Sequence, residues 1–179
     1  MGTGISTEEY SQLINKTAVY PTKVDNFGLA YAFLGLQDEF IEFYEKLILG
    51  DKDGAHKELG DIVWYIAAIC KETNLIFSDL IKDLLANPAD DLYDVEEVLF
   101  IIASYSGNVK KYYRDNKPLD LEKLYKEVLL AILQIVFYDG TEEEIMEVLQ
   151  KNYDKLIKRR ETNTIHGDGD NREDTPKAV

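Results

Sequence analysis

Two stretches decide the fold: FGLAYAFLGLQDEFIEFYEKLIL at Phe27–Leu49 and HKELGDIVWYIAAICKET at His56–Thr73. A short glycine-bounded turn, Gly50–Gly54, separates them. Apolar residues recur at helical spacing in the first stretch, which predicts an amphipathic helix. In the second, Ile62–Cys70 is apolar on every face, as is typical of a helix buried inside a bundle. Together the two stretches predict an antiparallel helical hairpin.

The rest of the chain is also helical in pattern, because apolar residues do not alternate as they do in strands. Ser6–Glu9 reads as a capping box that opens a first helix, which ends at Thr17–Pro21. Further helices are expected at about 76–85, 93–114, 120–138 and 141–160, the last capped by Thr141. We therefore predict an all-α fold.

The expected organisation is a single all-α domain over residues 1–160, followed by a polar tail at 161–179. Within the domain, a first hairpin at 27–73 precedes a second hairpin at 93–138 and a C-terminal helix at 141–160. Packed together as an internal pseudo-dimer, the two tandem hairpins would make a helical bundle with a four-helix core.

Composition narrows the functional classes. With 20 Lys and Arg against 34 Asp and Glu, the net charge is −14, which argues against nucleic-acid and membrane-surface partners. No apolar run approaches the ~20 residues of a membrane helix. The single cysteine, Cys70, lies in an apolar run, so we expect a buried thiol, no disulfide and a reducing, cytoplasmic location.

Two pairs of acids stand out, Glu39 with Glu42 and Glu58 with Asp61. At three-residue spacing, each pair lies on one helix face, roughly 5–6 Å apart, where like charges repel. In an antiparallel hairpin both pairs can meet across the interface, and buried carboxylates need a cation. An oxygen-rich cage of this kind suits Mg²⁺, with Mn²⁺ as an alternative.

Each pair also has a simpler interpretation, which the residues alone leave open. Glu39 and Glu42 can form a solvated acidic edge, with Glu42 paired to Lys46 four residues on. Glu58 and Asp61, near the start of their helix, can complement its dipole.

The spacing E-x-x-E, fifteen residues, E-x-x-D, within Leu34–Glu42 and Lys57–Tyr65, resembles the all-α nucleoside triphosphate pyrophosphohydrolases. This superfamily contains MazG-like enzymes and dimeric dUTPases. Thr17–Pro21, Asn152–Leu156 with Arg159 and Arg160, and Ile165–Arg172 also resemble MazG-like proteins. The resemblance covers most of the chain and depends on the order of these motifs together.

The resemblance implies hydrolysis of (deoxy)nucleoside triphosphates between the α and β phosphates, giving monophosphate and pyrophosphate. Glu39, Glu42, Glu58 and Asp61 would be the catalytic acids and metal ligands, so 27–73 would be the metal-binding hairpin. The second hairpin at 93–138 would be a degenerate copy, because it has no Asp or Glu between Glu97 and Asp115. A homodimer is expected, because relatives assemble through these helices. Three other functions stay open: a non-catalytic helical nucleotide-binding or interaction protein, a dUTPase, and a phosphoribosyl-ATP pyrophosphohydrolase.

Basic residues are the candidate substrate contacts. Relatives carry a basic string after the first acid pair, whereas here the matching Lys110-Lys111-Tyr112-Tyr113-Arg114-Asp115 falls in the second hairpin. Lys110, Lys111 and Arg114 share one helix arc and predict a phosphate-binding patch, unless they only complement a helix C-terminus. Lys151, Lys155 and Arg159 form a second stripe at four-residue spacing. The resemblance extends the substrate-binding set along the C-terminal part of the chain to Lys155, Arg159, Asp168, Asp170 and Arg172.

Two aromatic residues follow the second acid pair directly. A core role is the favoured interpretation for Trp64, because its whole segment is apolar. Tyr65 is a candidate for stacking on a base.

Overall fold

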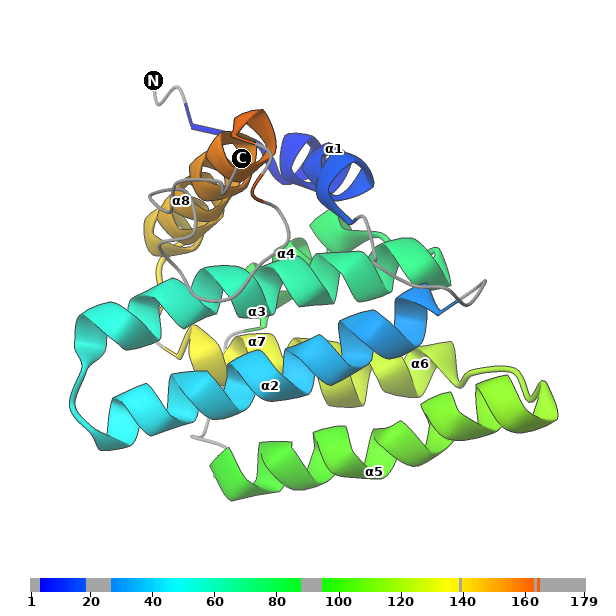
Figure 1. The fold of residues 1–179 in the computed structure, drawn as a ribbon. Helices are drawn as coiled ribbons and strands as arrows, with labels where there is room; N and C mark the ends of the chain where they lie inside the picture. The colour runs from blue at the N-terminus through cyan, green and yellow to red at the C-terminus, as the bar shows by residue number, and fades with distance from the viewer. Residues whose placement is uncertain (1–3, 19–26, 88–94, 139, 163, 165–179) are drawn as a thin grey trace, which may run out of the picture.

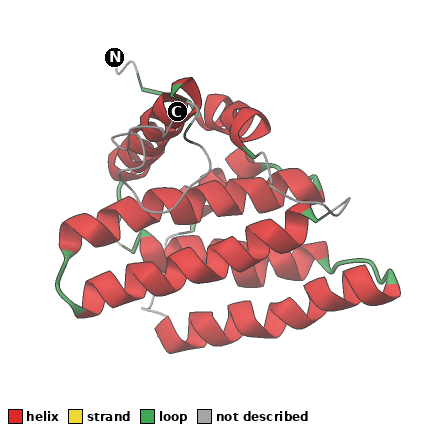
Figure 2. Cartoon of the chain, viewed as in Figure 1, coloured by secondary structure: helices red, strands yellow, loops and turns green. Residues whose placement is uncertain are grey.

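The computed structural model describes residues 4–18, 27–87, 95–138, 140–162 and 164. Within these ranges the chain is helical and contains no strand (Figure 2), which confirms the all-α prediction. The elements, in order, are α1 (Thr7–Thr17), α2 (Gly28–Ile48), α3 (Lys52–Thr73), α4 (Phe77–Ala86), α5 (Val95–Asp115), α6 (Leu121–Lys123), the π-helical segment η1 (Leu124–Leu130), α7 (Ala131–Val136) and α8 (Glu142–Glu161).

Helices α2 and α3 form the expected antiparallel hairpin (Figure 1). The turn between them is tighter than the sequence pattern predicts. Gly50 adopts a positive φ of 71°, and the Asp51 side chain accepts a hydrogen bond from the Gly54 backbone N–H. Asp51 therefore caps α3, and the helix starts at Lys52 rather than near His56, so that prediction is wrong by about one turn.

The other helices pack on the two sides of this hairpin. Helix α5 lies along α2, tied to it by a 2.6 Å hydrogen bond from Gln37 Nε2 to Ser106 Oγ. Helix α8 crosses α3 on the opposite side and also contacts α1 (Figure 1). The continuous run α6–η1–α7 contacts α5 and α4. That α5 and this run are a degenerate copy of the first hairpin, in a MazG-like arrangement, stays a prediction.

The predicted capping box at Ser6 with Glu9 is confirmed, and so is the predicted cap at Thr141, which forms a capping box with Glu144 as well. The helix predicted from Asp120 to about Tyr138 instead contains the π-helical segment η1, a local change of hydrogen bonding that helical periodicity cannot reveal.

One hydrophobic cluster runs through the described helices, from Tyr10 in α1 to Leu156 in α8. Cys70 is 1% exposed, as expected for a buried thiol. Trp64 packs against the cluster and donates a 3.0 Å hydrogen bond to Thr17 Oγ1, which fits the favoured core role. None of the described helices has the length and apolar character needed to cross a membrane.

Candidate metal centre

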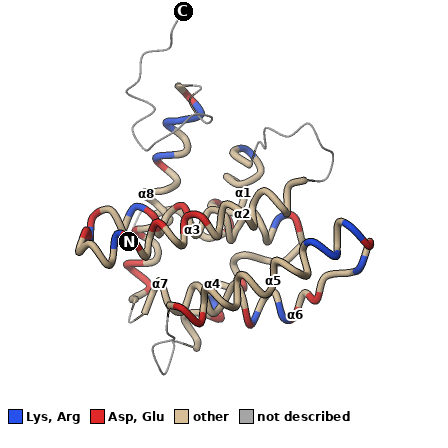
Figure 3. Tube along the Cα trace, turned by 60° about the horizontal axis from the view of Figure 1, so that its bottom comes forward, with Lys and Arg blue, Asp and Glu red and all other residues tan. Residues whose placement is uncertain are grey.

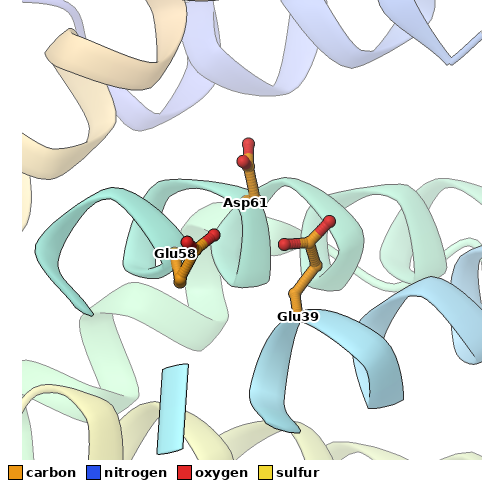
Figure 4. Close-up of side chains that lie close together, drawn as sticks. All are labelled: Glu39, Glu58 and Asp61. Atoms are coloured by element: carbon orange, nitrogen blue, oxygen red, sulfur yellow. The ribbon is translucent and has the colours of Figure 1, made fainter. Parts of the chain in front are cut away.

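Three of the four predicted acids come together between α2 and α3. Glu39 rises from α2 toward Glu58 and Asp61, which α3 carries one turn apart (Figure 4). One carboxylate oxygen from each lies within 4.8 Å of the others. Glu58 is only 5% exposed, and Glu39 and Asp61 are half-buried. The hairpin therefore concentrates three carboxylates at a largely buried point.

Glu42 lies outside this group of three and is exposed. A residue three positions after Glu39 is displaced by about 4.5 Å along the helix axis and 60° around it. Its charge nevertheless contributes to raising the pKa of Glu39. Glu42 thus acts on the cluster through its field, from the solvent side of α2.

The helix-dipole interpretation of Glu58 and Asp61 does not fit the observed helix. Because α3 begins at Lys52, Glu58 lies six residues further on and Asp61 nine. Dipole complementation falls off within the first turn, where Asp53 lies. Helix-dipole complementation therefore does not explain why Glu58 and Asp61 lie beyond the first turn of α3.

The pKa of Glu39 shows how strongly burial and the neighbouring acids oppose its ionisation. Burial, followed by the charges of Asp61, Glu42 and Glu58, raises the pKa of Glu39 from 4.5 to about 8, against an opposing contribution from Lys155. Without a cation, Glu39 therefore holds a proton at neutral pH, because ionising it would place another negative charge beside existing ones.

Asp61 has a cation already in contact. Lys155 Nζ, from α8, lies 2.6 Å from both Asp61 carboxylate oxygens. The exposed fractions of the two side chains are 21% and 17%, so water screens the pair poorly. Lys155 was a predicted substrate contact, and the structure places it at the acid cluster.

A second layer of polar contacts orients Asp61. Asn152 Nδ2 donates to Asp61 Oδ1 at 3.0 Å, and the Asn152 side-chain oxygen accepts from the Tyr10 hydroxyl at 2.7 Å. Both Asn152 and Tyr10 are buried. At Gly60 a Cβ would approach Asn152 to 3.0 Å, so the glycine permits α8 to lie this close to α3. The sequence pattern did not assign Tyr10 a role, because 142 residues separate it from Asn152.

An aromatic groove of about 480 Å³ opens beside the cluster, along one flank of α2. Tyr31, Tyr65 and Phe27 supply its rings, Gln37 and Asp38 its polar groups. Burial raises the pKa of Tyr65, and the charges of Tyr31 and Glu39 add to the rise, so Tyr65 lines the groove and also lies within electrostatic reach of Glu39. The remaining lining residues are Leu34, Gly35 and Ile41.

The predicted basic patch on α5 lies elsewhere. Lys110, Lys111 and Arg114 are exposed where α5 ends, and Lys and Arg gather there in Figure 3. The backbone N–H of Ala30 donates to the Tyr113 hydroxyl at 3.2 Å, so this end of α5 adjoins the start of α2. Glu39 is nine residues, or about 13 Å, further along α2. Arg114 also holds Asp115 through two 2.7 Å hydrogen bonds.

The C-terminal candidates divide into two groups. Arg159, one turn after Lys155 on α8, is only 4% exposed, so it is not a surface contact in this conformation. Asp168, Asp170 and Arg172 lie outside the described residues.

The three acids fit a small divalent cation. Two ligands on opposite sides of Mg²⁺ are about 4.2 Å apart. The three oxygens lie within 4.8 Å of one another, so small side-chain movements would let them share one ion. Hard oxygen donors are the ligands that Mg²⁺ and Mn²⁺ accept. Exposed acidic groups often gather without binding an ion; here, however, Glu58 is buried, and burial beside the other acids raises the pKa of Glu39 to about 8.

Comparisons with protein-family models, with curated proteins and with solved structures find no match to this chain.

Proposed function

We propose that this protein is a Mg²⁺-dependent nucleotide pyrophosphohydrolase that cleaves (deoxy)nucleoside triphosphates to monophosphate and pyrophosphate. The observation that carries the proposal is the cluster of Glu39, Glu58 and Asp61, with oxygens within 4.8 Å across a buried helix interface. The resemblance of the two acid motifs to MazG-like enzymes supports the same reaction. Mn²⁺ is the expected substitute metal.

The residues around the cluster have separate roles in this proposal. Glu39, Glu58 and Asp61 hold the metal, and Glu42 adds negative potential from the solvent side. Mg²⁺ held there would polarise the phosphates and lower the pKa of the attacking water. Lys155, which contacts Asp61, is the proposed cation for a phosphate oxygen.

The groove beside Tyr65 is the proposed site for the base. Tyr31 and Tyr65 offer ring faces for stacking. Gln37 and Asp38 offer hydrogen-bonding groups for a base edge. The Glu39 charge contributes to the raised pKa of Tyr65, and in this proposal a base stacked on Tyr65 has its phosphates directed toward the acids.

A homodimer is part of the same proposal. Leu34, Ile41 and Ile48 are 59%, 45% and 67% exposed and recur every seven residues along α2, the spacing of a helix-packing seam. Leu34 and Ile41 also line the proposed base groove, so a partner helix on this seam would lie at the edge of that groove. Light scattering coupled to size-exclusion chromatography tests this part, and a monomer at micromolar concentration would contradict it.

Product analysis tests the reaction. The protein is incubated with each common NTP and dNTP, with Mg²⁺ or with EDTA, and the products are separated by ion-exchange chromatography. We expect monophosphate and pyrophosphate only with metal, and none from Glu39→Gln or Asp61→Asn. If no nucleotide is turned over with Mg²⁺ or Mn²⁺, the enzyme proposal is wrong.

A further inference from the structure

The contact between Lys155 and Asp61 has a consequence for how metal and phosphate bind. The ammonium group engages both oxygens of Asp61 equally, at 2.6 Å, and those oxygens belong to the candidate metal cluster. A divalent ion that binds Asp61 must therefore compete with Lys155 for the same carboxylate.

The surroundings of Asp61 show how that competition can resolve. Asn152 donates to Oδ1 only, and its own carbonyl is fixed by Tyr10. When Lys155 leaves, Asn152 still holds Oδ1, so Oδ2 becomes the oxygen that is available to a cation. Asp61 keeps its orientation because its second contact comes from a buried, hydrogen-bonded amide.

Lys155 can move without moving its helix. Leu149, Asn152 and Leu156 bury the neighbouring turns of α8, whereas the ammonium group sits at the end of a flexible four-carbon chain. An ammonium group released beside a metal ion is repelled by that ion and attracted to a phosphate oxygen. Its new position is then set by the ligand.

We propose that Lys155 is a two-position cation that couples metal binding to phosphate binding. Lys155 neutralises Asp61 when no phosphate is present, which weakens binding of the metal alone. It transfers to a phosphate oxygen when a metal-bound pyrophosphate or triphosphate group enters. Metal and polyphosphate therefore bind cooperatively, with a coupling that depends on this one side chain. This inference rests on the proposed metal centre.

The test compares wild type with Lys155→Met, which keeps most of the side-chain length and removes the charge. Electron paramagnetic resonance measures binding of Mn²⁺ alone, and calorimetry in excess Mg²⁺ measures binding of pyrophosphate. We expect Lys155→Met to bind Mn²⁺ about tenfold more tightly and pyrophosphate about tenfold more weakly, because one charge favours one ligand and opposes the other. A purely structural lysine would weaken both.

Two controls separate charge from general effects. Lys158→Met removes an exposed cation from the same helix, outside the stripe of Lys151, Lys155 and Arg159, and it should change neither affinity. Lys155→Arg keeps the charge and should bind Mn²⁺ alone like wild type.

A measurement on wild type keeps the proposal testable if Lys155→Met does not fold. In protein with ¹⁵N-labelled lysine, the Lys155 ammonium signal should change with Mg²⁺ and change again with pyrophosphate. If the Lys155 signal changes with neither Mg²⁺ nor pyrophosphate, the proposal is wrong. It is also wrong if wild type and Lys155→Met bind Mn²⁺ with equal affinity. If wild type binds no Mn²⁺ at all, the metal centre fails as well.

Discussion

Glu39→Gln should make the protein more stable at alkaline pH when no metal is present. Glutamine has nearly the shape of a protonated glutamate, and its charge does not depend on pH. The wild-type carboxyl has a pKa of about 8 in the folded protein against 4.5 as its ordinary value. Between these two pH values the folded state holds a proton that the unfolded state has lost, so wild-type stability falls as pH rises.

The size of the effect follows from the shift. Each pH unit within this window costs about 1.4 kcal/mol. From pH 5.5 to pH 9 the protein crosses about 2.5 units of the window, which gives about 3.5 kcal/mol of lost wild-type stability as an upper bound. Glu39 keeps some contact with solvent, which reduces the effect below this bound.

Urea denaturation in EDTA at pH 5.5 and pH 9 measures the difference. The stability advantage of Glu39→Gln over wild type should be small at pH 5.5 and larger by about 2–3 kcal/mol at pH 9. Glu45→Gln, at an exposed acid on the same helix, should show no such growth. If the advantage of Glu39→Gln is the same at both pH values, the reasoning about the acid cluster is refuted.

Three further predictions concern the cluster and its surroundings. Because Glu39 is about 90% protonated one unit below its pKa of about 8, metal binding at pH 7 should release about 0.9 proton. Calorimetry in two buffers of different ionisation enthalpy measures this, with release falling toward zero above pH 9; equal heats at pH 7 would contradict it. Tyr10→Phe removes the donor to the buried Asn152 carbonyl and should lower the free energy of unfolding by about 1–3 kcal/mol, whereas Tyr138→Phe, at an exposed tyrosine, should have little effect in the same urea titration. Gly35→Ala drives a methyl group into the Tyr65 ring and should weaken nucleotide binding at the groove while sparing Mn²⁺ binding. Gly107→Ala, where a Cβ meets open space, is its control, and equal nucleotide affinities of the two variants would count against the groove.

The hairpin could be predicted from the sequence because its signals are local. Helical spacing in α2 and the all-apolar run in α3 depend only on neighbouring residues. The two capping boxes were also predictable, because Ser6 and Thr141 each precede a glutamate by three residues. The start of α3 was misplaced because Gly50–Gly54 reads as a turn throughout, whereas the Asp51 cap lets helix begin inside it.

The site was predictable only in part. The acid spacing identified Glu39, Glu58 and Asp61, since both pairs lie on helices of one hairpin. Which acid stays in solvent was not predictable, because the 60° rotation between Glu39 and Glu42 on α2 also separates Glu58 from Asp61 on α3, where both acids join the cluster. Helices outside the hairpin decide which of its side chains are covered, and the sequences of α2 and α3 do not show where those helices pack.

The contacts from outside the hairpin had the weakest signals. The sequence predicts that Lys155 contacts the substrate. Its contact with Asp61 could not be predicted, because 94 residues separate the two. Asn152 precedes Lys155 by one turn and faces the core, a pattern that would have identified it as a buried polar residue in need of a partner. Tyr10 had no comparable signal, because an apolar position near the N-terminus of a bundle usually signifies packing alone.

Anomalous diffraction from crystals grown with Mn²⁺ is the most direct test of the metal centre. The account predicts one or more anomalous peaks within about 2.6 Å of carboxylate oxygens of Glu39, Glu58 and Asp61, with Lys155 Nζ moved away from Asp61. No peak between α2 and α3, with Lys155 still on both oxygens of Asp61 at saturating Mn²⁺, would contradict it.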